Sequence, residues 1–151
     1  MPTATPPEIE TKLRQSADAL ESAATRPVVE VGVEDYCGVI MQRLSDAQKA
    51  WAEARDLHHE LCAEIVKVDP ALAPTTDSLT ETHGAITAQI VDLVSEALSI
   101  AGSADESARL ADTQGLKARV LSQVAECRNY EDRLNKALLD AHLRDRGRGA
   151  S

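Results

Sequence analysis

Apolar residues recur along most of the chain at alternating steps of three and four, the spacing that keeps one face of an α-helix buried. The longest of these seams consists of Cys37, Ile40, Leu44, Ala47, Trp51, Ala54, His58, Leu61, Ile65 and Val68. A second seam consists of Leu79, His83, Ile86, Ile90, Leu93, Ala97 and Ile100. Two sustained seams predict long helices that pack against each other, with the Trp51 side chain in the core.

Start and stop signals divide the chain into four predicted helices, at about 6–24, 34–68, 78–101 and 104–145, with a frayed tail at 146–151. Pro27 and Pro70 end the first two helices, because proline disfavours a helical conformation in the residue before it. Ser78 and Glu81 have the spacing of a capping box. Residues 28–33 are expected to form a tucked connector. The fold class is therefore predicted to be all-α, an elongated antiparallel four-helix bundle of one domain, residues 1–151, with coiled-coil-like seams.

Three glycines, Gly38, Gly84 and Gly115, fall inside these predicted helices. Each costs about 1 kcal/mol relative to alanine in a helix. The close approach of a neighbouring helix would explain them, as would loosened helix starts or, at Gly115, a kink; the sequence leaves these alternatives open.

The lengths of the predicted hairpins indicate which residues lie side by side. With the second connection centred near residue 73 and the third near 103, Cys127 lies level with Val68, and everything after it overhangs the hairpin. The overhang carries an apolar stripe of Tyr130, Leu134, Ala137, Leu138 and Ala141. An exposed stripe needs a partner, so it predicts an interaction surface, for a homodimer or for another protein. The alternative is that the last helix breaks near Asn129 and folds back.

Net charge narrows the choice of partner. The 151 residues carry a formal charge of −9, which disfavours nucleic acid and anionic membranes, since both need a basic face. Residues 128–151 hold six basic and four acidic side chains, so this segment is +2 and the remainder −11. The basic segment is either a solvated helix end or a handle for an acidic partner, including the acidic body of a second subunit.

Targeting features and cysteine usage indicate a compartment. We find no charged n-region followed by an apolar h-region near Met1, and no stretch of 18 consecutive apolar residues. We therefore expect neither a secretory signal nor membrane insertion. Three cysteines, an odd number without tight spacing, fit free thiols in a reducing cytoplasm.

Histidines and cysteines supply the candidate metal ligands. His58 and Cys62 lie one helical turn apart, and the hairpin geometry brings His83 and Cys127 to about the same level. These four side chains are a donor set for zinc or copper(I). Ordinary core packing explains the same residues without a metal, because buried cysteine behaves as a small hydrophobe. We expect core packing and no cofactor, with the metal site as the alternative.

Motifs for enzymatic chemistry are lacking in the sequence. It contains no Gly-x-Ser-x-Gly, no glycine-rich phosphate loop, and no Glu-x-x-His of the kind that di-iron bundles use. We therefore expect a non-enzymatic cytoplasmic protein that acts through helix–helix contacts, as an adaptor, a chaperone or an assembly subunit. The alternative is a metal-binding or redox-sensing helical bundle that uses the clustered cysteines and histidines.

Overall fold

All regular structure in the described part of the chain is helical, in a computed structural model that describes the backbone of residues 6–149 and the side chains of residues 8–143. The elements are α1 (Pro6–Ala24), α2 (Val28–Val31), α3 (Val33–Val68), the 3-10 turn η1 (Pro70–Leu72), α4 (Ala73–Ala101) and α5 (Glu106–Gly149). The predicted all-α class is confirmed.

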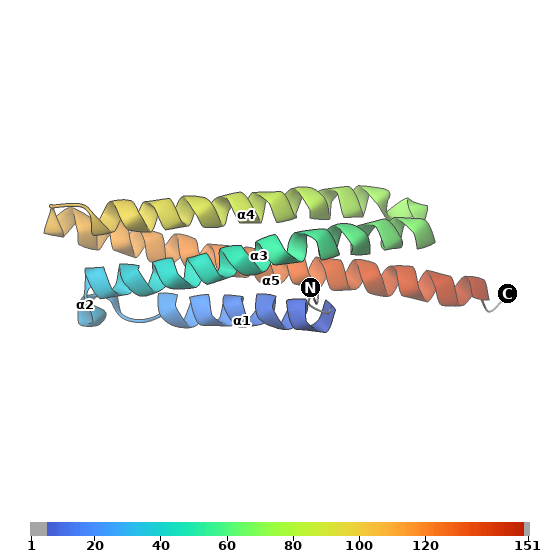
Figure 1. Cartoon of the computed structure of the whole chain (residues 1–151), viewed down its shortest axis with the longest axis horizontal. Helices are drawn as coiled ribbons and strands as arrows, with labels where there is room; N and C mark the ends of the chain where they lie inside the picture. Colours follow the sequence, from blue (N-terminus) through green and yellow to red (C-terminus); the bar gives the residue numbers. More distant parts are fainter. Residues whose placement is uncertain (1–5, 150–151) are drawn as a thin grey trace.

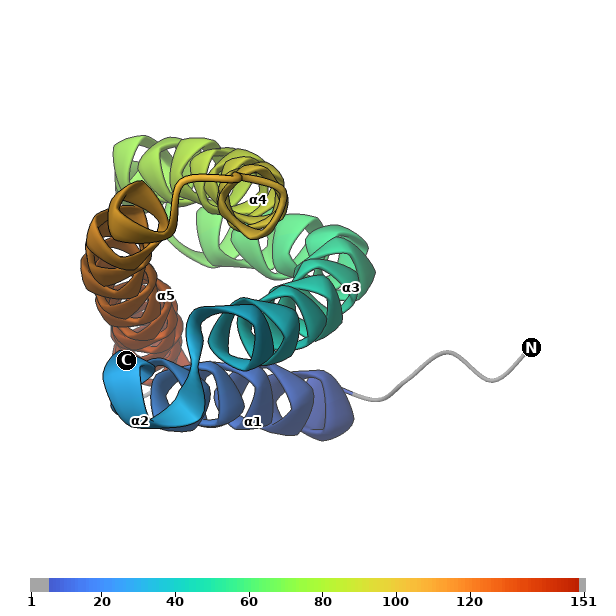
Figure 2. The same cartoon turned by 90° about the vertical axis from the view of Figure 1, so that its left-hand side faces the viewer.

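The four long helices lie side by side along one axis, and successive long helices run in opposite directions (Figure 1). Seen along that axis, α1 and α4 lie across from each other, and each packs on both α3 and α5 (Figure 2). α1 is the shortest of the four and leaves the end of α3 toward η1 uncovered (Figure 1). The far end, toward η1, is therefore built from α3, α4 and α5 alone.

The corner between α1 and α3 differs from the expected connector, because Val28–Val31 forms one helical turn, α2. Gly32 follows with φ of 94°, a conformation that side chains with a Cβ rarely adopt, and this lets the chain reverse into α3. The Tyr36 hydroxyl donates to the Ala24 carbonyl at 2.6 Å. This bond satisfies a carbonyl at the end of α1 that has no partner within its own helix.

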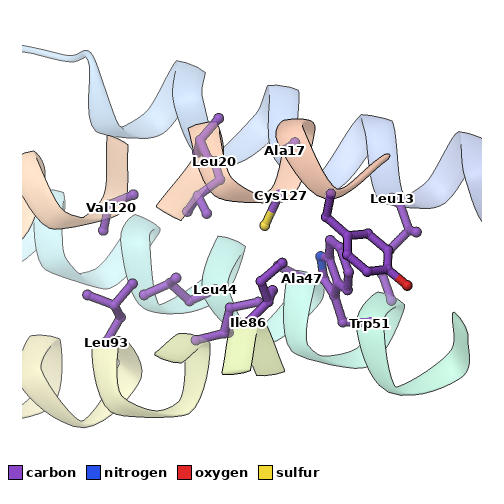
Figure 3. Packing of buried hydrophobic residues seen from close by; sticks show 14 of the residues in the cluster. Leu13, Ala17, Leu20, Leu44, Ala47, Trp51, Ile86, Leu93, Val120 and Cys127 are labelled. Atoms are coloured by element: carbon purple, nitrogen blue, oxygen red, sulfur yellow. The ribbon is translucent and has the colours of Figure 1, made fainter. Parts of the chain in front are cut away.

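The seam residues make the core. Next to α1 and toward the α4–α5 turn, the interior is aliphatic (Figure 3). We call this part the aliphatic half; it consists of Leu20, Ile40, Leu44, Ile90, Leu93, Leu116 and Val120. These side chains are at most 7% exposed. At about 25 cal/mol per Å² of apolar area, their burial is the main force that holds the helices together.

The start of α4 differs from the sequence expectation, whereas α5 is the single long helix that was expected. α4 begins at Ala73 and not near residue 78, because η1 completes the turn and the Asp69 side chain accepts from the Ala71 amide at 3.2 Å. Pro74 lies in the first turn of α4, where its missing N–H costs nothing. α5 is unbroken at Asn129, so the fold-back alternative is wrong.

One segment of the described chain, Pro70–Ala101, is long and apolar enough to cross a membrane by length and composition alone. The search for consecutive apolar residues missed it, because its mean hydropathy of 1.3 is an average over a window that includes polar residues. Core helices of soluble proteins meet the same criterion. Here the buried face of α4 packs on α3 and α5, so its apolar character also serves the core.

Candidate functional site

The four predicted metal ligands are buried, but they do not assemble into one site. The Nδ1 atoms of His58 and His83 lie 3.0 Å apart. The Cys127 sulfur instead faces Gln123 Nε2 at 4.0 Å and points into the core (Figure 3). Among residues 8–143, no three His, Cys, Asp or Glu side chains are placed to hold a metal ion. The predicted four-ligand set is therefore wrong, because only the two histidines meet.

The two histidines belong to a layer of four rings, Trp51, His58, His83 and Tyr130, which we call the histidine layer. All six pairs of these rings are in contact, with centroid distances from 5.0 to 6.1 Å. α3 contributes Trp51 and His58, α4 contributes His83, and α5 contributes Tyr130. Each ring is at most 3% exposed. The layer therefore joins three helices through polar rings in a mostly aliphatic core.

Hydrogen bonding fixes the tautomers of the two histidines by elimination. The Trp51 carbonyl lies 3.1 Å from His83 Nε2, and a carbonyl only accepts, so His83 Nε2 carries the proton. His83 Nδ1 then has a lone pair, and His58 Nδ1–H donates to it. The Tyr130 hydroxyl oxygen, 3.0 Å from the same His58 nitrogen, is the second acceptor for that proton. In this assignment both histidines are neutral.

Burial keeps these groups and the nearby thiols uncharged near neutral pH. Burial, with the charges of His83 and His59 as smaller causes, lowers the pKa of His58 to about 4. Burial also lowers the pKa of His83, against the opposing hydrogen bond to Trp51. Burial raises the pKa of Cys127 to about 12, so this thiol is protonated and is a poor ligand and nucleophile. These residues can pack and donate hydrogen bonds, but they do not form an acid–base pair poised for catalysis.

A small cavity of about 20 Å³ lies beside His58 and is the space closest to the layer. It is lined by Glu10, Leu13, Arg14, His58, Glu131, Leu134 and Asn135. Glu131 Oε1 is buried there without a hydrogen-bond partner, and burial raises the pKa of this carboxyl. The volume is close to that of a single water molecule, so the cavity has no room for a substrate.

The predicted interaction stripe on α5 is buried inside the molecule itself. Tyr130, Leu134, Ala137 and Ala141 are at most 5% exposed, and Leu138 is half-buried. The expected overhang of this stripe is wrong, because Tyr130 lies level with His58, a sequence separation of 72 residues. The hairpin geometry expected from sequence gave a separation of 59, so α5 lies 13 residues farther back along α3 than predicted.

The opposite face of the same segment of α5 is exposed. Leu139 and Leu143 are 56% and 54% exposed, and Lys136 precedes them at the spacing of one helix face. We call Lys136, Leu139 and Leu143 the α5 outer face; residue 146, the next position at this spacing, is an arginine. Sequence reasoning missed this face, although its steps of three and four were visible as a second, shorter seam.

Cations near the α5 outer face lack acidic partners. Arg133 donates to the Ser78 hydroxyl at 2.8 Å and to the Thr82 hydroxyl at 3.4 Å. Among the side chains from 8 to 143, neither Arg133 nor Lys136 forms an ion pair with a carboxylate. Arg128, one turn earlier, is by contrast paired with Glu21 and Asp18. By sequence, residues 128–143 carry no net charge, and the excess of +2 in residues 128–151 comes from the arginines that follow residue 143.

A pocket of about 500 Å³ lies at the other end of the molecule, where α2, the start of α3 and the start of α5 meet. We call it the acidic pocket; its lining is Val28, Val29, Gly32, Val33, Glu34, Asp35, Glu106, Arg109 and Leu110. Val29 is 74% exposed, the highest value among the described large hydrophobic residues. Nε and Nη2 of Arg109 are buried without a hydrogen-bond partner, although Nη2 lies 3.8 Å from Glu34 Oε1. The pocket therefore combines apolar surface, a surplus of carboxylates and an underused guanidinium.

With this geometry established, comparison of the chain with protein-family models, with curated proteins and with solved structures finds no match.

Proposed function

We propose that the protein is a non-enzymatic assembly subunit that associates with further copies of itself through the α5 outer face. The observation that carries this proposal is the pair of leucines at 139 and 143, half exposed on one helix face beside Lys136, which has no ion pair among residues 8–143. Isolated exposed leucines are ordinary on protein surfaces. Leucines that share one helix face with a charge opposite to that of the partner are typical of helix-docking surfaces.

The remainder of the molecule acts, in this proposal, as the frame that presents this surface. We propose that α1, α3, α4 and α5 form one elongated antiparallel four-helix bundle, and that α4 is a core helix rather than a membrane span. The histidine layer stiffens the frame by joining α3, α4 and α5 near the point where α1 stops covering the core. The protein is proposed to work in the cytoplasm, where its three free cysteines stay reduced.

The contribution of the histidine layer is proposed to be structural, which supports the choice of a non-enzymatic function. Its histidines are neutral, fully packed and hydrogen-bonded to each other and to a backbone carbonyl. The predicted alternative, a metal-binding or redox-sensing bundle, gains no support, because Cys62 and Cys127 are buried and their pKa values are raised.

The test is the mass in solution, measured by light scattering over a range of protein concentrations. We expect the full chain to exceed the monomer mass of 16.2 kDa. The variant Leu139→Glu/Leu143→Glu should return to the monomer mass, because it places two charges on the apolar contact. The matched control is Val91→Glu/Leu98→Glu, which alters two exposed residues on one face of α4, 42% and 57% exposed.

The control decides between a specific surface and general stickiness. If both double variants lower the mass equally, association is not specific to α5 and the proposal is wrong. A full chain that stays monomeric at every concentration also contradicts it. Circular dichroism of each variant checks that helical content is unchanged, as expected for substitutions at exposed positions.

A further inference from the structure

We propose that the α5 outer face of one copy docks into the acidic pocket of the next copy, so that the molecules join head to tail. This inference rests on the proposed function and names the partner surface. The two surfaces are complementary in charge. The pocket lining holds Glu34, Asp35 and Glu106 against the single cation Arg109. Residues 128–151, which include the α5 outer face, carry a formal charge of +2 by sequence, with Lys136 on the face and Asp140 one helical turn after it.

The apolar parts of the two surfaces also match. Two leucines one helical turn apart project from α5, and the pocket offers Val28, Val29, Val33 and Leu110 around about 500 Å³. Both sides are now in contact with water: Leu139 and Leu143 are more than half exposed, and Val29 and Leu110 are 74% and 38% exposed. Docking would remove all four side chains from solvent, which is favourable.

The arrangement of α5 excludes a contact within one chain. Glu106, Arg109 and Leu110 of the acidic pocket lie in the first turns of α5, and the outer face lies near its other end. The helix has 44 residues, which at 1.5 Å per residue is roughly 66 Å. One unbroken helix therefore holds the two surfaces at opposite ends of the molecule (Figure 1). Only another copy can bring them together.

Arg109 gives a second reason to expect an occupant in the pocket. Buried donors are nearly always hydrogen-bonded, and leaving them unpaired costs free energy. Two nitrogens of this guanidinium, Nε and Nη2, lack a partner in the isolated chain. Asp140, one helical turn after Lys136, is the carboxylate that a docked α5 can bring next to them.

The geometry has a consequence for the assembly. Each copy uses one surface on one neighbour and a different surface on the other, so the interface is heterologous. Because the two surfaces lie at opposite ends of an elongated molecule, growth continues into open chains and does not close at a dimer. The attraction between charged surfaces also weakens as salt is added.

The experiment uses two variants of the full chain, each with one surface disabled. The tail variant is Leu139→Glu/Leu143→Glu, and the head variant is Val29→Glu/Leu110→Glu. Light scattering at low salt should show wild-type mass rising with concentration past twice 16.2 kDa. Each variant alone should be monomeric, with the dissociation constant raised about tenfold or more by the lost apolar contact.

The decisive sample is an equal mixture of the two variants. The intact pocket of the tail variant can accept the intact α5 outer face of the head variant, so the mixture should form a species of 32.4 kDa, twice the chain mass of 16.2 kDa, and nothing larger. A mixture that stays monomeric while the wild type assembles overturns the inference. If the head variant alone still assembles, the α5 outer faces meet each other, and the inference fails while the proposed function stands. If the wild type never assembles, both fail.

Discussion

The aliphatic half and the histidine layer lie on the same helices and are equally buried, yet their packing imposes different requirements. Leu44 and Trp51 are seam residues two helical turns apart on α3, at most 1% exposed. Leu44 packs among aliphatic side chains (Figure 3), and another apolar side chain of similar volume could replace it. Trp51 contacts three polar rings and also accepts a hydrogen bond at its carbonyl from His83.

The difference shows that one hydrophobic pattern can conceal two kinds of core. Aliphatic packing is non-directional and tolerates sliding of one helix along another, because each residue meets a similar neighbour after a shift. The histidine layer is directional, since His58 meets a partner only when His83 and Tyr130 stand at one level. The layer is therefore the part of the core best suited to fix the register of α3, α4 and α5.

Removal of the Trp51 ring should give the largest effect. Trp51→Ala should lower the free energy of unfolding by about 4 kcal/mol, because it leaves a cavity beside three rings that cannot collapse without losing their hydrogen bonds. Leu44→Ala, its counterpart in the aliphatic half, should cost about 3 kcal/mol. Urea unfolding followed by circular dichroism measures both.

An exposed leucine provides the control for Trp51→Ala and Leu44→Ala. Leu98→Ala, on the exposed surface of α4, should change stability by about 0.5 kcal/mol or less. If Trp51→Ala costs less than Leu44→Ala, the layer relaxes around the missing ring, and its directional role is wrong.

Sequence spacing was sufficient to identify the buried faces. Eight positions of the α3 seam that the pattern assigned to the core are buried: Cys37, Ile40, Leu44, Ala47, Trp51, Ala54, His58 and Ile65. In the last turns Leu61 and Val68 are only partly buried, and Cys62 is buried instead. Periodicity predicts this much because a helix turns in the same way whatever it packs against.

Sequence spacing could not predict register, and the candidate sites depend on register. α5 lies 13 residues farther back along α3 than expected, close to two seven-residue repeats, so seam residues face seam residues in both arrangements. The pairing of His58 with Tyr130 follows from this shift, as does the burial of the predicted stripe. The Ser78 capping signal added to the error, since α4 starts at Ala73 and the Ser78 hydroxyl accepts from Arg133.

The second largest difference between the histidine layer and the aliphatic half should be in how their contributions to stability respond to acid. The pKa of His58 is lowered from 6.5 to about 4 in the folded protein. As pH falls, the unfolded chain therefore binds a proton at His58 before the folded protein does. The contribution of neutral His58 to the free energy of unfolding is complete above pH 6.5 and is lost as pH falls toward 4. The loss from this one group is about 3 kcal/mol between pH 7 and pH 4. The lowered pKa of His83 acts in the same direction.

Variants separate this effect from the titration of the carboxylates. The difference in unfolding free energy between wild type and His58→Gln should shrink as pH falls from 7 to 4, measured by urea unfolding at each pH. If the difference in unfolding free energy between wild type and His58→Gln stays constant with pH, His58 has an ordinary pKa in the folded state and the prediction is wrong. Leu44→Ala should cost the same at both pH values.

The helical glycines offer the finest comparison. A Cβ at Gly38 or at Gly84 would meet nothing within 4 Å, so close approach of a neighbouring helix explains neither. Gly38→Ala and Gly84→Ala should each raise the free energy of unfolding by about 0.5–1 kcal/mol, because alanine restricts the unfolded chain and favours the helix. Gly115→Ala should gain a similar amount, since its Cβ would stand 3.4 Å from the Arg119 guanidinium, the end of a flexible side chain that can move aside. Thermal or urea unfolding measures all three.

Gly38 and Gly84 differ in what lies next to them, which makes them a local probe of the two regions. Gly38 follows Cys37 beside the aliphatic half, and Gly84 follows His83 in the histidine layer. Equal gains would show that the backbone of α4 at the layer is as relaxed as that of α3. A gain at Gly38 with a loss at Gly84 would instead show that His83 reaches its partners only because the next residue allows the helix to adjust. The hydrogen bonds of the histidine layer would then determine the local backbone geometry of α4. The aliphatic half makes no such demand on the backbone of α3.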